Sequence, residues 1–511
     1  MEIGQITKMS GRHIGFFLGL FLFILLLLLP APEGMKLAAW RVAAITALMA
    51  TWWITEAIPI PATSLLPLFL FPALGVMPAK LTAAPYADDV IYLFIGGFFL
   101  AVTMERWNLH RRVALNTIKL VGSSPAKLVL GFMVATAFLS MWVSNSATAM
   151  MMVPIGLAVV SEVTGLSASD LKNNTDGKNT DMNFGRALML GIAYAASIGG
   201  LATIIGTPPN AILVGIVKKM YNYEISFFQW MQVGLPLAVV TLFVTWFILI
   251  KFLFPTKPFV RGNAGEVIDD EIAKLGNITR PELTILIIAS CMATLWIISG
   301  FVFKHVPALK MINDSTIAIG GAVILFATPI SLSKGEFLLD WKTAVKIPWD
   351  VVLLFGGGLA LANGFQQTEL THYIAQQLVH LQGMHSYLLI TIIVIFTISL
   401  TEVTSNTATA TLLVPIMGTV AIAIGINPIG PMVAAAFAAS YAFMLPVATP
   451  PNAVAYGSGC FTIKNMAMAG LWINLFCFVI IPVTLYLLIP LFWGENLNMV
   501  PEWAKIVAQP K

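Results

Sequence analysis

Two apolar stretches of the chain carry the same run of hydroxyl and amide side chains. Residues 139–155 read LSMWVSNSATAMMMVPI, and residues 400–416 read LTEVTSNTATATLLVPI. Each peptide holds a Ser-Asn pair, and the two asparagines, Asn145 and Asn406, are 261 residues apart. Neutral oxygen ligands from Ser, Thr and Asn suit a hard monovalent cation such as sodium. The spacing therefore predicts two related cation-binding segments in one chain.

A second motif follows each copy. Residues 206–212 read GTPPNAI, and residues 448–454 read ATPPNAV. The second proline of each pair is expected to force the preceding residue towards an extended conformation and to break the helix. In hydrocarbon a broken helix survives only where it lines a protein cavity. Each break yields a half-helix end, and the free N–H groups at a helix start suit an anion.

The charges around these motifs limit the chemistry further. No Lys, Arg or His lies in either tip or in either Thr-Pro-Pro-Asn motif. An anion would be held by neutral donors and by bound cations, so its affinity would depend on the cation, as coupled transport requires. Glu402 is the acidic residue of the second tip. It could be a proton-coupling carboxylate, but its counterpart in the first copy is Met141, which favours an orienting or structural role.

The composition indicates a membrane protein. Of 511 residues, 58% are hydrophobic and 10% are charged, whereas soluble domains carry about 25% charged residues. The net charge is +4, and the Lys and Arg residues lie mostly between apolar segments. This distribution does not indicate a nucleic-acid partner. The three cysteines (Cys291, Cys460 and Cys477) lie in apolar segments as packing residues, and we expect no disulfide, resident metal or organic cofactor. A membrane-embedded enzyme would need a nucleophile–base pair or a metal cluster, and the sequence shows neither. A channel is also disfavoured, because two opposed hairpins would close a binding site rather than line an open pore.

Apolar segments long enough to cross a bilayer recur along the chain. We predict an all-α polytopic fold with about eleven transmembrane helices, near residues 14–31, 38–54, 61–77, 89–105, 187–217, 231–252, 281–301, 311–330, 349–366, 430–461 and 468–492. The two motif-bearing segments, 125–162 and 386–424, are predicted to be re-entrant hairpins. The first apolar run is expected to be a retained helix.

The distribution of basic residues predicts the orientation. With the amino terminus inside, most of the 28 lysines and arginines fall in inside segments. The basic flanks of the first hairpin and the uncharged flanks of the second then lie on opposite sides, so the halves form an inverted repeat, and the carboxyl terminus lies outside. Residues 106–127 are expected to form an interfacial helix, residues 254–280 a charged linker, and residues 163–186 a polar loop.

At these motifs the chain resembles a known family, the divalent anion/sodium symporters, which include bacterial dicarboxylate carriers related to mammalian sodium/dicarboxylate and sodium/citrate cotransporters. The resemblance covers about residues 35–490 and is carried by TSNTATATLLVPI at 404–416, the paired tips and the paired Thr-Pro-Pro. The family's first tip is usually Ser-Asn-Thr, but this chain has Ser146 in the third position. Serine keeps the hydroxyl and loses a methyl, so substrate preference could shift while binding survives.

The resemblance implies a homodimer in which a scaffold domain holds a transport domain that moves as an elevator. The expected divisions are N-terminal scaffold helices at 1–124, a first transport half at 125–253, a linker and second scaffold helices at 254–385, a second transport half at 386–492, and a tail at 493–511. The expected location is the bacterial inner membrane, with the amino terminus cytoplasmic and the carboxyl terminus periplasmic.

The resemblance also implies site residues. A first sodium site would use Ser140, Ser144, Asn145 and the backbone near Gly206. A second would use Thr401, Thr404, Asn406 and the backbone near Ala448. The substrate would contact Asn145, Ser146, Asn406 and Thr407, with Thr207 and Thr449 behind. The predicted function is sodium-coupled uptake of C4-dicarboxylates such as succinate, fumarate and malate. The alternative is a sodium-independent dicarboxylate or citrate antiporter.

Overall fold

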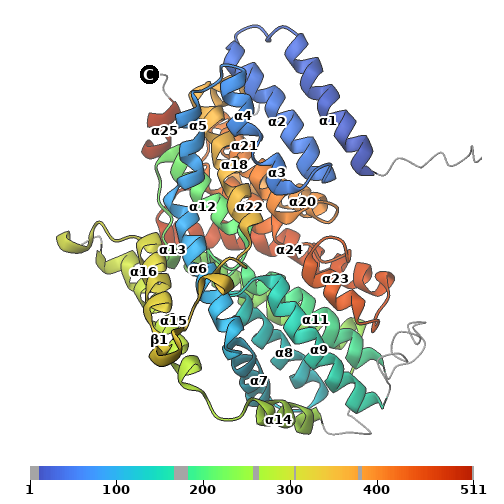
Figure 1. The fold of residues 1–511 in the computed structure, drawn as a ribbon. Coiled ribbons are helices and arrows are strands. Elements are labelled where there is room, and N and C mark those ends of the chain that lie inside the picture. Colours follow the sequence, from blue (N-terminus) through green and yellow to red (C-terminus); the bar gives the residue numbers. More distant parts are fainter. Residues whose placement is uncertain (1–10, 166–181, 257–263, 304–305, 378–382, 509–511) are drawn as a thin grey trace, which may run out of the picture.

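The structure is a computed structural model that describes residues 11–165, 182–256, 264–303, 306–377 and 383–508. Helices make up nearly all of its regular structure (Figure 1). Most of the polar loop predicted at 163–186 lies outside the described residues.

The first part of the chain runs from the outer helices into the first motif-bearing hairpin and its broken partner. Its elements are α1 Gly11–Leu28, α2 Leu37–Thr55, α3 Ile60–Thr63, α4 Leu66–Ala73, α5 Ala79–Ala83, η1 Ala84–Ala87, α6 Asp89–Arg106, α7 Leu109–Val121, α8 Pro125–Ser140, α9 Asn145–Thr164, α11 Asn183–Gly200, α12 Pro208–Tyr221, α13 Phe227–Phe247 and the π-helical turn η3 Ile248–Leu253.

The second part repeats much of this order after a linker. Its elements are α14 Ala264–Leu275, α15 Arg280–Ile298, η4 Ser299–Phe303, η5 Pro307–Leu309, α16 Asp314–Ala327, β1 Pro329–Ser331, η6 Leu332–Lys334, β2 Glu336–Phe337, α17 Trp341–Ala344, α18 Trp349–Gln367, α19 Leu370–Gln377, α20 Ser386–Thr401, α21 Asn406–Ile424, α22 Ile429–Ala439, α23 Pro450–Gly457, α24 Ile463–Leu488, η8 Ile489–Trp493 and α25 Glu502–Ala508. Strands β1 and β2 form a small antiparallel hairpin.

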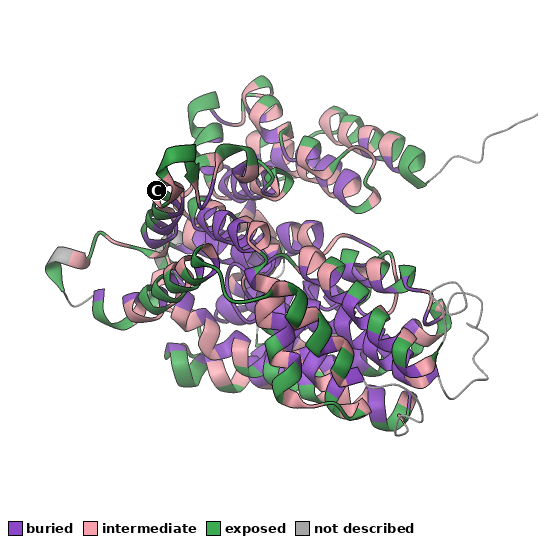
Figure 2. Cartoon of the chain, turned by 60° about the horizontal axis from the view of Figure 1, so that its bottom comes forward, coloured by how far each residue is buried: buried purple, intermediate pink, exposed green. Residues whose placement is uncertain are grey.

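The length and composition of the helices confirm a polytopic membrane fold. Within the described residues, eight helices are long and apolar enough to span a bilayer. Three of them, α1, α15 and α24, bury less than a third of their apolar windows, and their exposed side chains include Phe17, Ile287 and Val479. Figure 2 shows buried residues concentrated in the middle of the molecule and exposed ones along its outer helices. Apolar outer faces of this kind are suited to lipid.

Two predicted spans differ from the structure. The segment 61–77 is wrong as a single helix, because it forms α3 and α4, which meet near Ser64 and Leu65 with Pro67 in the first turn of α4. Proline lacks the N–H that would continue a helix across this point. The span predicted at 311–330 ends at Ala327, where the chain turns into the β1–β2 hairpin.

The structure repeats the order of its elements in two halves. Helices α6, α7, α8 and α9 correspond to α18, α19, α20 and α21, and the broken pair α11–α12 corresponds to α22–α23. The backbone follows the same spacing. Asn108 before α7 and Glu369 before α19 are 261 residues apart, and both have a left-handed backbone, with φ of 56° and 61°. The repeat therefore extends beyond the two motifs.

The ion pairs mark two opposite ends of the helices. At the start of α6 Asp89 pairs with Lys218, and at its end Arg106 pairs with Asp340. Each of the ten ion pairs among the described residues joins segments predicted to lie on the same side of the membrane. The pairs agree with the predicted grouping of loops. Which group is cytoplasmic stays a prediction.

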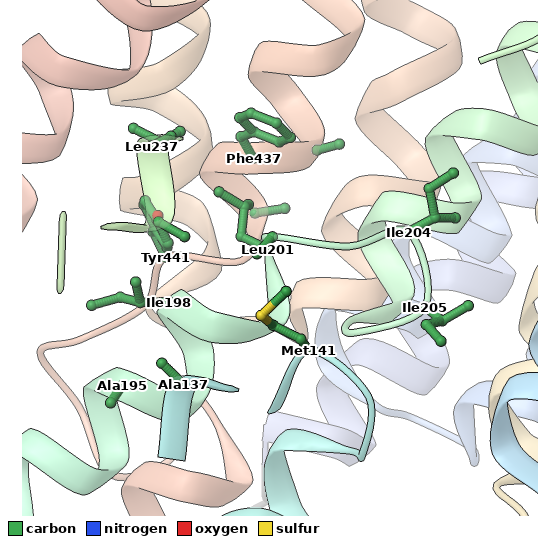
Figure 3. Packing of buried hydrophobic residues seen from close by; sticks show 14 of the residues in the cluster. Ala137, Met141, Ala195, Ile198, Leu201, Ile204, Ile205, Leu237, Phe437 and Tyr441 are labelled. Carbon is green, nitrogen blue, oxygen red and sulfur yellow. The ribbon is translucent and has the colours of Figure 1, made fainter. Parts of the chain in front are cut away.

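Two hydrophobic clusters hold the helices together. The larger runs through both hairpins and both broken helices. The smaller joins α2 and α4 to α18 through residues such as Trp53, Phe71 and Leu361. Figure 3 shows the larger cluster beside the first hairpin, where Met141 lies next to Leu201, with Ile204 and Ile205 on the segment that follows. The core therefore surrounds the polar tips and fixes where they lie.

Candidate functional site

Each motif-bearing segment folds as a helical hairpin with its Ser-Asn pair at the tip. Helices α8 and α9 are joined by residues 141–144, and α20 and α21 by residues 402–405; we call these four-residue turns the first and second tips. Helices α9 and α21 begin at Asn145 and Asn406. Ser144 Oγ accepts a hydrogen bond from Ala147 N at 3.3 Å and caps α9.

The first tip gathers three polar groups around one amide. Ser140 is fully buried, and its Oγ lies 2.5 Å from the Asn145 amide and 2.7 Å from Ala196 O. With its nitrogen facing inward, the amide of Asn145 donates to Gly206 O at 3.3 Å and to Ala196 O at 3.1 Å. With its oxygen facing inward, the same amide would complete a ring of oxygen atoms. Such a ring needs a cation or a proton donor at its centre.

The second tip repeats this arrangement with a threonine in place of the serine. Thr401 is fully buried, and its Oγ1 donates to Asn406 Oδ1 at 2.7 Å and lies 3.0 Å from Ala439 O. Thr404 Oγ1 lies 2.7 Å from Thr409 Oγ1 and donates to Leu400 O at 2.8 Å. Thr404 is thus bound within its own hairpin.

The Thr-Pro-Pro-Asn motifs break both helices, but one residue earlier than predicted. The extended residues are Thr207 and Thr449, with φ/ψ of −146°/143° and −142°/150°. Both prolines of each pair lie inside the first turn of the following helix, α12 or α23. A first-turn N–H has no partner within the helix, so proline costs little there. The prediction that the second proline forces an extended residue before it is therefore wrong; the first proline does so.

Each hairpin packs against a broken helix of the other half as well as against one of its own half. Helix α9 of the first hairpin packs against α23, and α21 of the second packs against α12. Each hairpin also packs against the broken helix of its own half, α8 and α9 against α11, and α20 and α21 against α22. Four helices that start at a motif, α9, α12, α21 and α23, therefore belong to one packed unit.

The structure leaves three of the predicted substrate residues with free hydroxyls. In the part of the chain that the structure describes, the hydroxyls of Ser146, Thr207 and Thr407 have no hydrogen-bond partner. Thr449 differs, because its Oγ1 accepts from Asn452 N at 3.3 Å. Thr207, Thr449 and Ala448 are all buried.

Glu402 binds backbone rather than a proton-transfer partner. Its Oε1 accepts from Phe443 N at 2.8 Å and from Asn474 Nδ2 at 2.7 Å, and its Oε2 accepts from Met444 N at 3.0 Å. All of these groups donate, which suits an ionised carboxylate. The contacts tie the second tip to the segment before α23 and to α24. They agree with the orienting role that the sequence favoured, which stays a prediction.

Several residues of the site act through groups that the sequence did not single out. Ala196 and Ala439 contribute carbonyl oxygens, and Thr203 Oγ1 donates to Met141 O at 2.6 Å while accepting from Gly206 N at 3.1 Å. A signal for the two alanines exists, since residues 193–197 read AYAAS and residues 436–440 read AFAAS. Among the described residues, no group of three His, Cys, Asp or Glu could hold a metal ion.

Comparisons with known proteins give the family. The family model described as the sodium:sulfate symporter transmembrane region matches residues 10–500. The chain belongs to this family. The resemblance to divalent anion/sodium symporters drawn from the motifs is thereby confirmed, and the protein is a transporter rather than an enzyme.

Similar proteins from two staphylococci match nearly the whole chain. The sodium-dependent dicarboxylate transporter SdcS of Staphylococcus saprophyticus is 44% identical over 489 residues, which are 96% of this chain and 93% of that protein. SdcS of Staphylococcus aureus strain USA300 is 44% identical over 492 residues, with the same coverage.

Two solved structures share the fold. MtrF of Neisseria gonorrhoeae has a TM-score of 0.55 at 13% identity and covers 94% of this chain and 95% of its own. The YdaH transporter of Alcanivorax borkumensis has a TM-score of 0.56 at 12% identity, covering 91% of this chain and 100% of its own.

Proposed function

We propose that this protein is a sodium-coupled symporter of C4-dicarboxylates such as succinate, fumarate and malate. The observation that carries the proposal is the pair of repeat-related clusters in which a buried hydroxyl, an asparagine amide and a backbone carbonyl meet at a hairpin tip. The SdcS relatives, named as sodium-dependent dicarboxylate transporters, support the choice of both ions.

The first sodium ion would bind at the first tip. Ser140 Oγ, Asn145 Oδ1, Ala196 O and Gly206 O are the oxygens that the fold gathers there. Without the ion, the amide nitrogen of Asn145 faces the other oxygens and satisfies them. With the ion, the amide oxygen would turn inward instead. The amide is thus a two-position group whose preference depends on sodium. Ser144, which caps α9, would contribute through its backbone.

The second sodium ion would bind at the second tip. Thr401 Oγ1, Asn406 Oδ1 and Ala439 O are the equivalent oxygens, and the backbone near Ala448 would complete the site. The Thr404 hydroxyl, bound to Leu400 O and Thr409, would support this site from behind.

The dicarboxylate would lie between the tips, against the starts of α9, α12, α21 and α23. Helix starts present free N–H groups and a positive dipole end. Asn145, Ser146, Asn406 and Thr407 would donate to the carboxylates, with Thr207 and Thr449 behind them. Because the motifs hold no basic side chain, bound sodium would supply the missing positive charge. Substrate affinity would then depend on sodium, which gives coupling.

Movement would follow the elevator scheme expected for the family. Residues 125–253 and 386–492 would form the transport domain, and residues 1–124 and 254–385 the scaffold of a homodimer in the bacterial inner membrane, with the amino terminus cytoplasmic. If more than two sodium ions accompany each dianion, the cycle moves positive charge inward. Each net charge gains about 2.3 kcal/mol per 100 mV of membrane potential.

The test is uptake of radiolabelled succinate into proteoliposomes with one driving force at a time. The proposal predicts uptake with an inward sodium gradient and none with a potassium gradient. Uptake that needs unlabelled succinate inside and ignores sodium would make the protein an exchanger. Uptake of sulfate or citrate in place of succinate would correct the substrate while keeping the site.

A further inference from the structure

Two asparagines that follow the Pro-Pro pairs have no role in the scheme above. Asn210 on α12 and Asn452 on α23 are both fully buried and are 242 residues apart, the same spacing as Thr207 and Thr449. Neither carries a charge or faces solvent. A buried amide is costly unless its polar atoms find partners, so the partners indicate what each asparagine does.

The asparagines bind the backbone of the broken segments. Asn210 Nδ2 donates to Thr203 O at 2.7 Å and to Gly200 O at 3.0 Å. In the second half, Asn452 Nδ2 donates to Leu445 O and to Ala442 O, both at 3.0 Å. Gly200 and Ala442, like Thr203 and Leu445, are themselves 242 residues apart. The same two contacts are therefore made twice, in sequences that differ at every carbonyl position.

The chemistry of these contacts explains the residue type. A helix that ends in a protein interior leaves carbonyl oxygens without donors, and buried carbonyls need them. The amide NH₂ supplies two N–H donors from one atom. Among the residues that the structure describes, the Oδ1 atoms of Asn210 and Asn452 are buried and have no hydrogen-bond partner. A turned amide would point this oxygen at the carbonyl oxygens, so the orientation is fixed and the donors are the groups that the fold uses.

The segment held by Asn210 lies beside the oxygen atoms that surround Asn145 at the first tip. An ideal Cβ placed on Gly200 would lie 2.6 Å from Asn145 Oδ1, and one placed on Gly206 would lie 2.3 Å from Gly200 O. Gly206 N in turn donates to Thr203 Oγ1 at 3.1 Å. Asn210 thus holds two carbonyls of a short segment, and Gly206 O at the end of that segment lies 3.3 Å from the Asn145 amide. In the second half, Leu445 O also accepts from Ala448 N at 3.2 Å, which links Asn452 to the backbone near Ala448.

We propose that Asn210 and Asn452 are positioning residues, each of which holds one broken segment in the shape that the neighbouring tip needs to bind its cation. This inference rests on the proposed sodium coupling. Each asparagine binds backbone carbonyl groups and would not itself coordinate the sodium ion, which would bind at the tips. Its loss lets the segment relax, so that Gly206 O or the backbone near Ala448 moves away from the cluster.

The test compares Asn210→Ala and Asn452→Ala with the unaltered protein in proteoliposomes. The sodium concentration that gives half-maximal succinate uptake is expected to rise about tenfold in each variant, as loss of one to two buried hydrogen bonds implies. The succinate concentration for half-maximal uptake at saturating sodium is expected to stay unchanged. In detergent, the stabilisation of the purified protein by sodium against heat is expected to shrink in parallel.

A merely structural role would give a different result. It would lower the melting temperature without sodium and leave the sodium dependence of uptake as it was, and that outcome overturns the proposal. If the alanine variants do not fold, Asn210→Ser and Asn452→Ser keep one donor each and carry the same test. Unaltered sodium dependence in the serine variants also overturns it. A wild-type protein indifferent to sodium would instead refute the proposed function, before any variant is compared.

Discussion

Gly200 and its counterpart Ala442 distinguish the two tips by a single methyl group. The position that a Cβ would take on Gly200 lies 2.6 Å from Asn145 Oδ1 and 3.1 Å from Gly206 O. These distances are shorter than van der Waals contacts, so the first cluster has no room for a side chain there. The second half carries alanine at the equivalent position. Gly200 is therefore required by the close packing of the first cluster.

Gly200→Ala should weaken sodium binding at the first tip. The added methyl would push the Asn145 amide away from Gly206 O, and a loss of about 1.4 kcal/mol raises the half-saturating sodium concentration about tenfold. The sodium dependence of succinate uptake measures it. Ala442→Gly is the matched control and should stay close to wild type. Equal sodium dependence of uptake in both variants would contradict the claim that the first tip has no room for a side chain at position 200.

Glu402→Gln should cost stability rather than proton coupling. The substitution directs an NH₂ group at donors such as Met444 N or Phe443 N, and loss of a charge-assisted hydrogen bond costs about 1.5–3 kcal/mol. A lower melting temperature in detergent is the expected readout, with exposed Glu336→Gln as the control. A variant that melts normally but loses the pH dependence of uptake would make Glu402 a proton carrier.

Some residues of the candidate site could be predicted from the sequence and others could not. Serine, threonine and asparagine stand out in apolar segments because hydrocarbon penalises them, so the Ser-Asn pairs with Asn145 and Asn406 could be singled out from the motifs. Ser140 and Thr401 were expected only from the family resemblance. Ala196 and Ala439 act through backbone carbonyls, which every residue has. Only the fold, which brings α11 and α22 against the hairpins, distinguishes them from other alanines. The roles of Asn210 and Asn452 depended on the same packing.

At the scale of elements, α7 is clamped to the linker helix α14 and to the start of α15. Arg112 donates from Nε to Glu282 Oε1 at 2.8 Å and from Nη1 to Gly276 O at 2.9 Å. The Glu282 side chain is 4% exposed and also accepts from Thr279 N at 2.7 Å. Figure 1 shows α14 beside α7, at the end of the molecule opposite α4 and α5. The clamp fixes the helix that leads into the first hairpin.

Arg112→Ala should be strongly destabilising. It leaves Glu282 buried without its countercharge, which costs about 3–5 kcal/mol. Lys119→Ala is the matched control on the same helix, because its pair with Asp269 is more than half exposed on both sides and such pairs contribute about 0–1 kcal/mol. Thermal unfolding in detergent compares them. Similar melting temperatures would show that the clamp is unimportant.

Two carboxylates that pair with basic residues of α6 and α7, Glu271 and Asp340, should make the stability of the folded protein depend on pH. Hydrogen bonds from Lys274 and Arg111 hold the pKa of Glu271 below its usual range, and the Thr343 N–H and Arg106 do the same for the pKa of Asp340. A lowered pKa stabilises the folded state above the unfolded pKa of about 4, and this stabilisation is lost as the pH falls further. The melting temperature should therefore be steady near neutral pH and fall in acid. In Glu271→Gln the acid-dependent fall should be smaller; an unchanged fall would contradict the role of Glu271.

The elements themselves were largely predictable, with exceptions that have physical causes. Long apolar runs fix the spans. The Pro-Pro pairs fix the breaks, because the first proline disfavours a helical backbone at the threonine before it. The division of 61–77 into α3 and α4 and the β1–β2 hairpin depend on neighbours. Short helices gain little from propensity alone and are decided by packing.

At the scale of the whole molecule, the proposed transport and scaffold parts meet in an ion-pair cluster. Lys218 Nζ on α12 lies 2.8 Å from Asp89 Oδ2 on α6 and 2.9 Å from Glu224 Oε1, and Asn313 Nδ2 donates to Asp89 Oδ2 at 2.8 Å. The positions equivalent to Asp89 and Lys218 in the second half are Asp350 and Cys460, which form no such charge pair. The cluster would hold one of two alternating states.

An elevator motion requires this contact to break. In a background without the native cysteines, Asp89→Cys and Lys218→Cys joined by a reducible thiol-reactive cross-linker, long enough to replace the lost lysine side chain, should block succinate uptake, and reduction should restore it. Each single cysteine variant is the control, and the cross-linker should leave its uptake unchanged. Full transport by the cross-linked protein would show that α12 and α6 do not separate.

The most direct test of the central claim is sodium-driven succinate uptake by Asn145→Ala and Asn406→Ala in proteoliposomes, beside the wild type. The account predicts that each variant is folded yet takes up no succinate on a sodium gradient, because each loses the amide around which one tip is built. Uptake by either variant at the wild-type sodium concentration would contradict it, and would remove the Ser-Asn tips as the place where sodium and dicarboxylate are coupled.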